Sequence, residues 1–184
     1  MKKTPKMGNS HNRTGPLNDH EINFLVKNTN MSRDEILIWH KKFLIDFPNG
    51  YINKKEFGQL FKNLYGDLKG NPEKFSKFVF KAFDESSDGK ISFSEFLIAT
   101  SFLDSNQKPE NRLELAFDIF DSNDDHKIDK KEFNKVFEAL YAIQGISSKE
   151  AKEKVQEILK NYPGSTLTKE EFIRVCQEEN ILSL

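Results

Sequence analysis

Residues 84–95 read D-E-S-S-D-G-K-I-S-F-S-E. Oxygen-bearing side chains stand at the first, third, fifth, ninth and twelfth positions, and the carbonyl of the seventh residue offers another oxygen. Gly89 at position six permits the sharp turn that wraps a chain around an ion. A calcium ion takes about six to eight oxygen ligands, and this spacing provides them. The predicted ligands are Asp84, Ser86, Asp88, Lys90 through its carbonyl, Ser92 and Glu95.

The same spacing defines the EF-hand, a loop between two amphipathic helices with an apolar residue at position eight. Ile91 stands at that position, Phe78 and Phe83 precede the loop, and Phe96 and Leu97 follow it at helical spacing. The alternative is a solvated acidic turn between two helices, which these apolar residues disfavour.

Loops of this length recur about every 35–40 residues, which indicates an internal repeat. We number them loop 1 (45–56), loop 2 (84–95), loop 3 (121–132) and loop 4 (160–171). Loop 3 has a second full ligand set: Asp121, Asn123, Asp125, Lys127 through its carbonyl, Asp129 and Glu132. We therefore predict two Ca²⁺ ions, and Mg²⁺ could occupy the same sites when calcium is absent.

Position six of loop 3 is His126, where the EF-hand normally has glycine. That position requires a positive φ, which costs a non-glycine residue of order 1 kcal/mol, although histidine tolerates it better than most residues. We expect loop 3 to bind calcium in a weakened or slowed manner.

Loops 1 and 4 lack ligand oxygens. Ile45 and Phe47 occupy positions one and three of loop 1, and Pro48 stiffens position four. Lys160 and Tyr162 occupy positions one and three of loop 4. We expect neither loop to bind calcium.

All four loops keep glutamate at position twelve, with a capping residue three positions before it. This arrangement also forms a helix capping box, so the glutamate alone is a weak indicator of calcium. The capping residues are Asn53, Ser92, Asp129 and Thr168. The apolar residues at position eight are expected to pair as short β bridges, Ile52 with Ile91 and Ile128 with Leu167.

The predicted fold is therefore all-α, with four EF-hands in two pairs and short β bridges between the paired loops. We expect a flexible arm over residues 1–17, an N-terminal pair over 18–104, and a C-terminal pair with the tail over 105–184. The chain carries 31% charged residues and a net charge of −1, so charge does not indicate a nucleic-acid partner.

Other residue types bound the function further. A single cysteine, Cys176, excludes an internal disulfide and suits a reducing compartment. No apolar run approaches the roughly 20 residues of a membrane span, and residues 1–16 lack the apolar centre of a signal peptide, so we expect a cytoplasmic location. The four histidines show no metal-ligand spacing, and no histidine lies near Cys176 in the sequence, so we expect no enzyme.

Three stretches give the chain a resemblance to the neuronal calcium sensor family of the recoverin and frequenin type. They are D-F-P-N-G at 46–50, F-V-F-K-A-F-D at 78–84, and E-F-I-R-V-C-Q-E-E-N-I-L at 171–182. The resemblance implies four hands in two pairs and calcium-dependent regulation of membrane proteins or lipid enzymes. Three features depart from the family pattern: Phe47 replaces a cysteine, His126 replaces a glycine, and the Met-Gly start at Met7 is internal.

Aromatic residues recur at helical spacing around loops 1 and 2: Trp39, Phe43, Phe57, Phe61, Phe78 and Phe96. Such residues are usually core, but four helices cannot bury all of them against each other. A surplus exposed on calcium binding would form a groove for an amphipathic target helix. Seventeen Phe against three Met predict rigid walls and few targets. The resemblance suggests channels, receptors or lipid enzymes as targets.

Two other functions remain open: a calcium buffer, and a constitutive regulatory subunit similar to calcineurin B. Calcium-dependent binding of a hydrophobic dye would identify a sensor, because buffer hands barely open.

The segment M-G-N-S-H-N, beginning at Met7, resembles the start of an N-myristoylated protein. If translation began at Met7, Gly8 could carry myristate and bring the protein to the periphery of a membrane. The alternative is a flexible tail with a chance Met-Gly pair.

Overall fold

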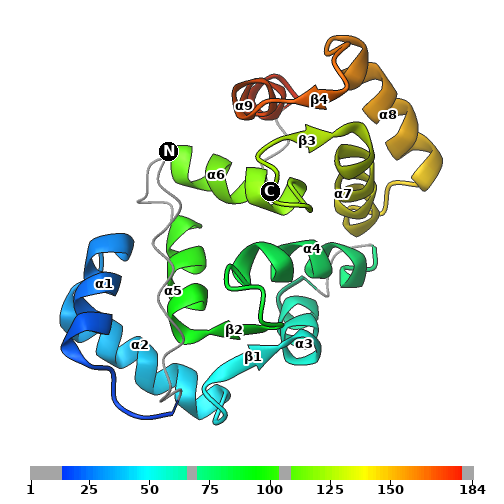
Figure 1. Cartoon of the computed structure of the whole chain (residues 1–184). Coiled ribbons are helices and arrows are strands. Elements are labelled where there is room, and N and C mark those ends of the chain that lie inside the picture. Colours follow the sequence, from blue (N-terminus) through cyan, green and yellow to red (C-terminus); the bar gives the residue numbers. More distant parts are fainter. Residues whose placement is uncertain (1–13, 66–69, 104–108, 180–184) are drawn as a thin grey trace. The chain divides into compact units, whose positions relative to one another are not determined.

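The computed structural model describes residues 14–65, 70–103 and 109–179 (Figure 1). Helices dominate, and the strands are two or three residues long. In chain order the elements are α1 (Asp19–Thr29), α2 (Arg33–Asp46), β1 (Tyr51–Asn53), α3 (Lys54–Tyr65), α4 (Glu73–Phe83), β2 (Lys90–Ser92), α5 (Phe93–Phe102), α6 (Pro109–Phe120), β3 (Ile128–Asp129), α7 (Lys130–Ile143), α8 (Ser148–Lys160), β4 (Thr166–Leu167) and α9 (Lys169–Glu178). Each predicted loop lies between two helices, which confirms the all-α EF-hand fold.

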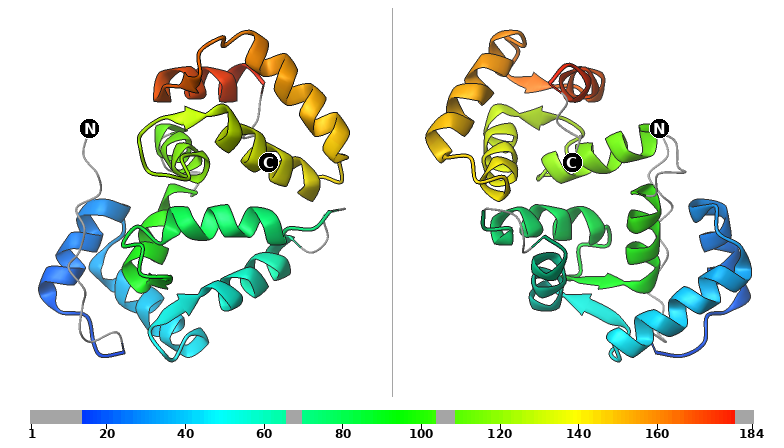
Figure 2. Two further views of the ribbon diagram at one scale, coloured as in Figure 1. Left: turned by 45° about the vertical axis from the view of Figure 1, so that its right-hand side comes forward. Right: turned by 180° about the vertical axis from the view of Figure 1, so that it is seen from behind.

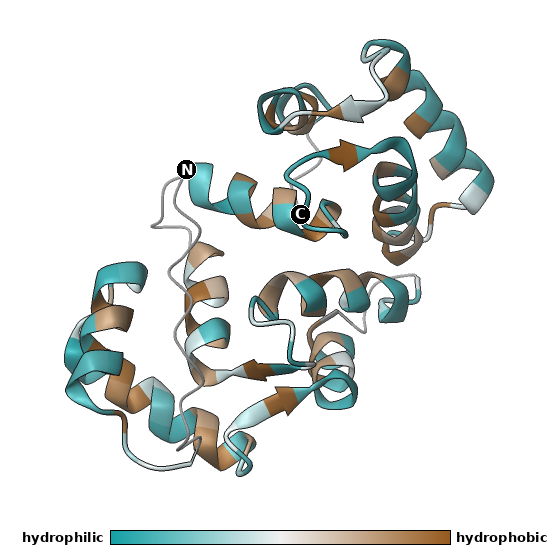
Figure 3. Ribbon diagram, in the orientation of Figure 1, coloured by the Kyte–Doolittle hydropathy of each residue, from teal (hydrophilic) through white to brown (hydrophobic). Residues whose placement is uncertain are grey.

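Short antiparallel strands join the loops in pairs. Ile52 in β1 lies opposite Ile91 in β2, and Ile128 in β3 lies opposite Leu167 in β4. Figure 1 and the right-hand view of Figure 2 show β1 and β2 side by side. The apolar residues of β1, β2 and β3 appear as brown bands in Figure 3. The predicted β bridges are therefore confirmed. Each pair joins a loop with a full set of calcium ligands (loop 2 or loop 3, here called calcium-type) to a loop that lacks them (loop 1 or loop 4).

Reciprocal capping boxes begin the helices that leave the loops. In loop 1 the backbone N–H of Asn53 donates to Glu56 Oε2 at 2.8 Å, and the N–H of Glu56 donates to Asn53 Oδ1 at 3.0 Å. Loops 2, 3 and 4 repeat the box at the start of α5, α7 and α9. Because the box satisfies N–H groups that the first helical turn leaves unpaired, it explains a glutamate at position twelve even where calcium ligands are missing.

The chain forms two compact units. The first contains residues 1–56 and 83–108, and the second contains residues 57–82 and 109–184. Loops 1 and 2 belong to the first unit with α1, α2 and α5, while loops 3 and 4 belong to the second. The units therefore do not coincide with the expected segments 18–104 and 105–184, and the independence of those segments as domains stays a prediction.

Phenylalanine rings form much of the core of the second unit. Phe133 and Phe137 stack at a centroid distance of 5.2 Å, and Phe120 contacts Phe172 at 4.9 Å. Phe75 and Phe78 of α4 pack against the same cluster. Fully burying a phenylalanine side chain contributes roughly 1.5–3 kcal/mol, so these rings stabilise the helices around loops 3 and 4 substantially.

The first unit has its own core, formed by side chains from α1, α2, α5 and the β1–β2 pair. Its fully buried members are Ile22, Leu25, Ile36, Ile52, Ile91 and Leu97. His40 is also buried and meets the ring of Phe93 edge-on at a centroid distance of 4.8 Å. Phe93 stands at position ten of loop 2, so this core supports the calcium-type loop directly.

Candidate metal centres in loops 2 and 3

The carboxylate at position one organises the turn of loop 2. Asp84 is buried where α4 ends, and its two oxygens accept the N–H groups of Asp88 at 3.0 Å and Gly89 at 2.9 Å. The carboxylate of Asp88 in turn accepts the N–H of Lys90 at 2.9 Å. These bonds curl positions one to seven into a ring with carboxylate oxygens on its inner side.

Glu95 closes this ring from the other end of loop 2. Its Oε1 accepts the N–H of Ser86 at 2.9 Å, and its Oε2 accepts the N–H and hydroxyl of Ser92 at 2.8 and 2.7 Å. Ser86 Oγ also lies 3.4 Å from Asp84 Oδ1. The predicted ligands at positions one, three, nine and twelve are thus gathered in one place.

Loop 3 repeats the arrangement with different residues. Asp121 accepts the N–H groups of Asp125 at 3.2 Å and His126 at 2.8 Å, and Asp125 accepts the N–H of Lys127 at 2.9 Å. The position-twelve carboxylate of Glu132 is held by the hydroxyl of Ser122 at 2.9 Å. The two loops therefore share one hydrogen-bond scaffold.

Remaining ligands of loop 3 lie at the rim of this scaffold. The exposed Asn123 donates from Nδ2 to Asp125 Oδ2 at 3.1 Å. Asp129 accepts the N–H of Glu132 at 2.7 Å as the helix cap. Every predicted side-chain ligand of loop 3 is thus connected to at least one other residue of the loop.

Burial makes both position-one carboxylates electrostatically costly. It raises the pKa of Asp84 above the ordinary value, and the nearby carboxylates of Glu95 and Asp88 raise it further, against the opposing N–H groups. Burial likewise raises the pKa of Asp121, where Asp125 adds repulsion. A divalent cation among these oxygens would offset the repulsion, so both residue sets fit calcium.

Backbone conformation at position six follows the prediction. Gly50 and Gly89 have φ values of 71° and 81°, and His126 adopts the same left-handed conformation with φ 64°. His126 keeps the turn because its N–H still reaches Asp121, so only its side chain distinguishes this position from that of loop 2.

Position four carries a requirement that the sequence interpretation missed. Ser87 in loop 2 has φ 57°, and Asp124 in loop 3 has φ 61°. Loops 1 and 4 both have proline at this position, Pro48 and Pro163. Proline holds φ near −65° and cannot adopt the left-handed region. The shared proline was visible in the sequence, but its meaning depends on the positive φ of its counterparts.

Loop 1 forms its turn without a carboxylate. The N–H of Gly50 donates to the carbonyl of Phe47 at 2.9 Å, a bond that replaces the one to a position-one aspartate. Ile45 at position one is 69% exposed. Loop 1 therefore does not offer the ligand set that calcium requires.

Loop 4 departs further from the calcium-type arrangement. Tyr162 at position three is buried in the core cluster, and its hydroxyl donates to Glu178 at 3.1 Å. Neither Gly164 nor Ser165 has a positive φ. The chain at loop 4 is used for packing, and its residues do not fit a calcium ion.

The six aromatic residues predicted to line a target groove divide between the two compact units. Phe43, Phe57 and Phe61 are buried, Phe78 and Phe96 are half-buried, and Trp39 is 41% exposed. Trp39, Phe43 and Phe96 belong to the first unit, and the other three to the second. A groove lined by all six stays a prediction.

Gly8 and the rest of the basic arm to residue 13 lie outside the described residues. Among the described residues, no helix is both long enough and apolar enough to span a membrane.

Comparisons with known proteins agree with the loop geometry. The EF-hand domain pair model matches residues 44–101, and the EF hand model matches residues 113–137. Neuronal calcium sensor 1 of Lymnaea stagnalis is 35% identical over 176 residues, which cover 91% of each chain. S-modulin of Aquarana catesbeiana is 31% identical over 135 residues, which are 73% of this chain and 64% of that protein. Recoverin of Homo sapiens is 34% identical over 107 residues, 56% of this chain and 52% of that protein.

Fold, loop geometry and family models together define an EF-hand calcium-binding protein. The chain belongs to the neuronal calcium sensor family, as the match along nearly the whole of neuronal calcium sensor 1 shows. It is accordingly a calcium sensor and not an enzyme. The match spans less than two thirds of S-modulin and about half of recoverin.

Proposed function

We propose that this calcium sensor binds two Ca²⁺ ions, one in loop 2 and one in loop 3, and passes the signal to a target protein. The observation that carries the proposal is the scaffold common to these two loops. In each, a buried position-one aspartate accepts the N–H groups of positions five and six. Because the backbone already holds the ligands close together, calcium would bind with little reordering of the loop.

The oxygen ligands for calcium in these loops would come from side chains and backbone carbonyls of the chain itself. Asp84, Asp88 and Glu95 would supply most of the charge in loop 2. Loop 3 would have four carboxylates, and Mg²⁺ could occupy either loop when calcium is scarce.

Isothermal calorimetry on metal-free protein tests the number of sites. The proposal expects two Ca²⁺ ions per chain, and a stoichiometry of three or four would overturn the view that loops 1 and 4 are inactive. A stoichiometry of one would show that the scaffold of loop 2 or loop 3 is insufficient for binding.

The target surface is proposed to be apolar and to include α2 of the first unit. Leu37, Ile38 and Trp39 of α2 are between 39% and 55% exposed, an unusual concentration of large apolar side chains on one helix. An amphipathic helix of a channel, receptor or lipid enzyme would cover them. The buried rings of Phe43, Phe57 and Phe61 would each become available to a target only if calcium opened the hand that carries the ring.

Trp39 can report the binding of a target helix to this surface, because it is the one tryptophan of the chain. Calcium followed by an amphipathic peptide should shift its emission to shorter wavelength, since the peptide would remove water from the indole. Emission that responds to neither addition would place the target surface elsewhere.

Two alternative functions make different predictions in the same assays. A calcium buffer would bind both ions without calcium-dependent binding of a hydrophobic dye. A constitutive subunit similar to calcineurin B would capture the same target with and without calcium. The sensor proposal expects dye binding and target capture that both require calcium.

Peripheral contact with a membrane is also part of the proposal. A myristoyl group on Gly8 would give only marginal membrane binding by itself and would need a second signal. The intact mass of the native protein decides the matter, because a lipid-free mass that begins at Met1 would exclude acylation of Gly8.

A further inference from the structure

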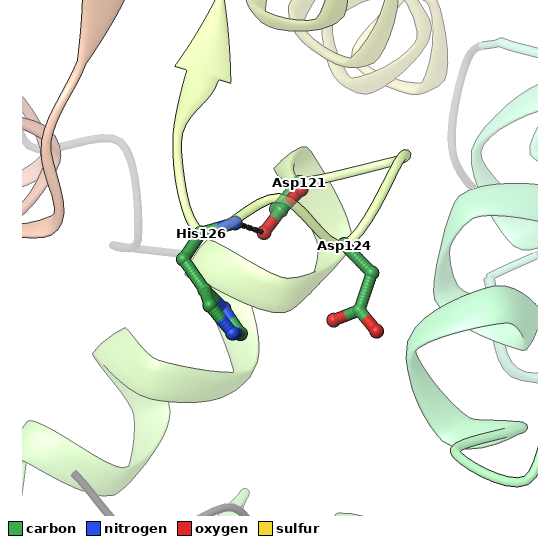
Figure 4. A group of neighbouring side chains, drawn as sticks. All are labelled: Asp121, Asp124 and His126. Carbon is green, nitrogen blue, oxygen red and sulfur yellow. Dashed lines mark hydrogen bonds between the residues drawn. The ribbon is translucent and has the colours of Figure 1, made fainter.

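Loop 3 brings three metal-binding side chains together on one side of its turn. The ligand atoms of Asp121, Asp124 and His126 all lie within 4.8 Å of one another. Figure 4 shows the side chains of Asp124 and His126 directed to the same side of the loop, with Asp121 between the two segments that carry them. Asp121 is buried, whereas the other two side chains are exposed and can adjust.

Backbone conformation explains why these side chains meet. Asp124 and His126 both have positive φ, at 61° and 64°, and the N–H of His126 donates to Asp121 Oδ2 at 2.8 Å. The turn that prepares the loop for calcium therefore also fixes the backbone positions from which the two side chains project. Sequence spacing alone could not indicate this, because the histidine finds its partners among aspartates and not among other histidines.

The chemistry of this trio, Asp121, Asp124 and His126, differs from that of a calcium site. Calcium prefers oxygen ligands, whereas an imidazole nitrogen together with carboxylates suits zinc. In the EF-hand scheme the side chains at positions four and six do not ligate calcium. Asp124 and His126 are thus two metal-binding groups that the calcium site does not use.

We propose that loop 3 is also a Zn²⁺ site, formed by Asp121, Asp124 and His126 with water completing the coordination. Ligand atoms of tetrahedral zinc lie about 3.4 Å apart, given metal–ligand bonds of about 2.0–2.1 Å. The observed separations of up to 4.8 Å must therefore shrink by at most about 1.4 Å. Rotation of the exposed Asp124 and His126 side chains can supply that movement.

Zinc and calcium would exclude one another in loop 3. Both need the carboxylate of Asp121, and two divalent cations sharing one carboxylate would repel each other strongly. This consequence depends on the proposed calcium site, whereas zinc binding itself depends only on the trio. Zinc would accordingly lower the apparent calcium affinity of loop 3 and leave loop 2 unaffected.

Loop 2 provides an internal control. It has the same backbone turn, but Ser87 and Gly89 occupy positions four and six, so the trio cannot form there. Any zinc bound by loop 2 would have to use the calcium carboxylates alone. The proposal therefore expects one zinc ion of higher affinity per chain, located in loop 3.

The test is calorimetric titration of the full metal-free chain with Zn²⁺ and, separately, with Ca²⁺. Asp124→Asn and His126→Asn each remove one zinc ligand and retain a residue that tolerates positive φ. We expect each to weaken zinc binding at least about tenfold, because even residues behind a metal ligand cost about 10–100-fold when replaced. Asp124→Asn should leave calcium affinity within about twofold.

Glu132→Gln is the reciprocal control, since Glu132 completes the calcium shell and lies outside the trio. It should remove calcium from loop 3 and leave zinc binding unchanged. Nitrogen-detected NMR of the imidazole supplies a direct readout, because zinc should shift the ring nitrogens of His126 and calcium should not.

Several results would overturn the proposal. Zinc binding that survives His126→Asn at full affinity would assign the metal to the carboxylates alone. Unchanged His126 ring signals with zinc bound would have the same meaning. The absence of any zinc binding would refute the site as a whole. A chain that binds zinc as described but fails to bind calcium in loop 3 would instead refute the two-calcium function and leave this site standing.

Discussion

At the scale of single residues, a few positions of the calcium-type loops have separable roles. Position one supplies the carboxylate that accepts two N–H groups, as Asp84 does. Position four needs a positive φ, and position six needs it as well. Position twelve combines a possible metal ligand with a helix cap, as Glu95 illustrates. A substitution that preserves the remaining contacts of its position should therefore change one role and leave the others intact.

Replacing Glu95 by glutamine should remove one bound calcium ion per chain. The change removes the charge and the bidentate ligation that complete the shell of loop 2, while glutamine can still serve in a capping box. Calorimetry should report one site in place of two, with unchanged helix content by circular dichroism. Glu56→Gln in loop 1 is the matched control and should leave the stoichiometry unchanged, and a second site that persists in Glu95→Gln would contradict the ligand assignment.

Replacing His126 by glycine should tighten calcium binding in loop 3. Glycine relieves a left-handed conformation that costs a non-glycine residue about 1 kcal/mol, which corresponds to roughly a fivefold change in affinity. Calcium titration with loop 2 inactivated by Glu95→Gln isolates the effect. Equal or weaker affinity would mean that the His126 side chain stabilises the turn in some other way.

At the scale of elements, each inactive loop is the structural partner of a calcium-type loop. Loop 1 contributes β1 to the pair with β2, and loop 4 contributes β4 to the pair with β3. Apolar residues at position eight bury this contact, with Ile52 and Ile91 both fully buried. An inactive loop is therefore retained for its strand and its helix cap, and these need no ligand oxygens.

Restoring the ligands of loop 1 should not restore calcium binding while Pro48 remains. Ile45→Asp with Phe47→Asp completes the side-chain pattern, but proline keeps position four out of the left-handed region. The double variant should still bind two ions, and adding Pro48→Asn should raise the number to three, because asparagine tolerates positive φ. Three ions bound by the double variant would show that loop 1 can bind calcium with a different backbone.

At the scale of the whole molecule, both compact units combine one calcium-type loop with its own apolar core. In the first unit this core includes a buried ionisable residue, His40 of α2, whose ring contacts that of Phe93. Burial lowers the pKa of His40, and the negative charge of Glu21 opposes this effect. The stability of the chain should therefore depend on pH through His40.

The sign of this dependence follows from proton binding. Between the lowered folded pKa of His40 and its unfolded value of about 6.5, the unfolded chain binds more protons, so stability rises with pH. Stability should accordingly fall as the pH drops below about 6.5. Urea unfolding of metal-free protein should show a smaller loss on acidification for His40→Asn than for the unmodified chain.

The quantity to compare is the change in the free energy of unfolding with pH. Its absolute value is not informative, because His40→Asn also removes packing against Phe93 at every pH. His20→Asn, at an exposed position of α1, is the matched control and should leave the slope as it is. An identical slope in all three proteins would assign the acid sensitivity to the carboxylates of the loops.

The sequence alone determined the features that depend on near neighbours along the chain. The four loops and the capping boxes follow from fixed spacing, because a ligand, a cap and its helix lie within twelve residues. The pairing of Ile52 with Ile91 is a longer-range feature, and it was predictable because both residues occupy position eight of a repeated loop. Only the tertiary structure decided which apolar residues are buried, because burial depends on segments that are distant in sequence. Tyr162 lies in the core for this reason, while Trp39 remains exposed. The trio around His126 belongs to the same class, because backbone angles and not spacing bring its side chains together.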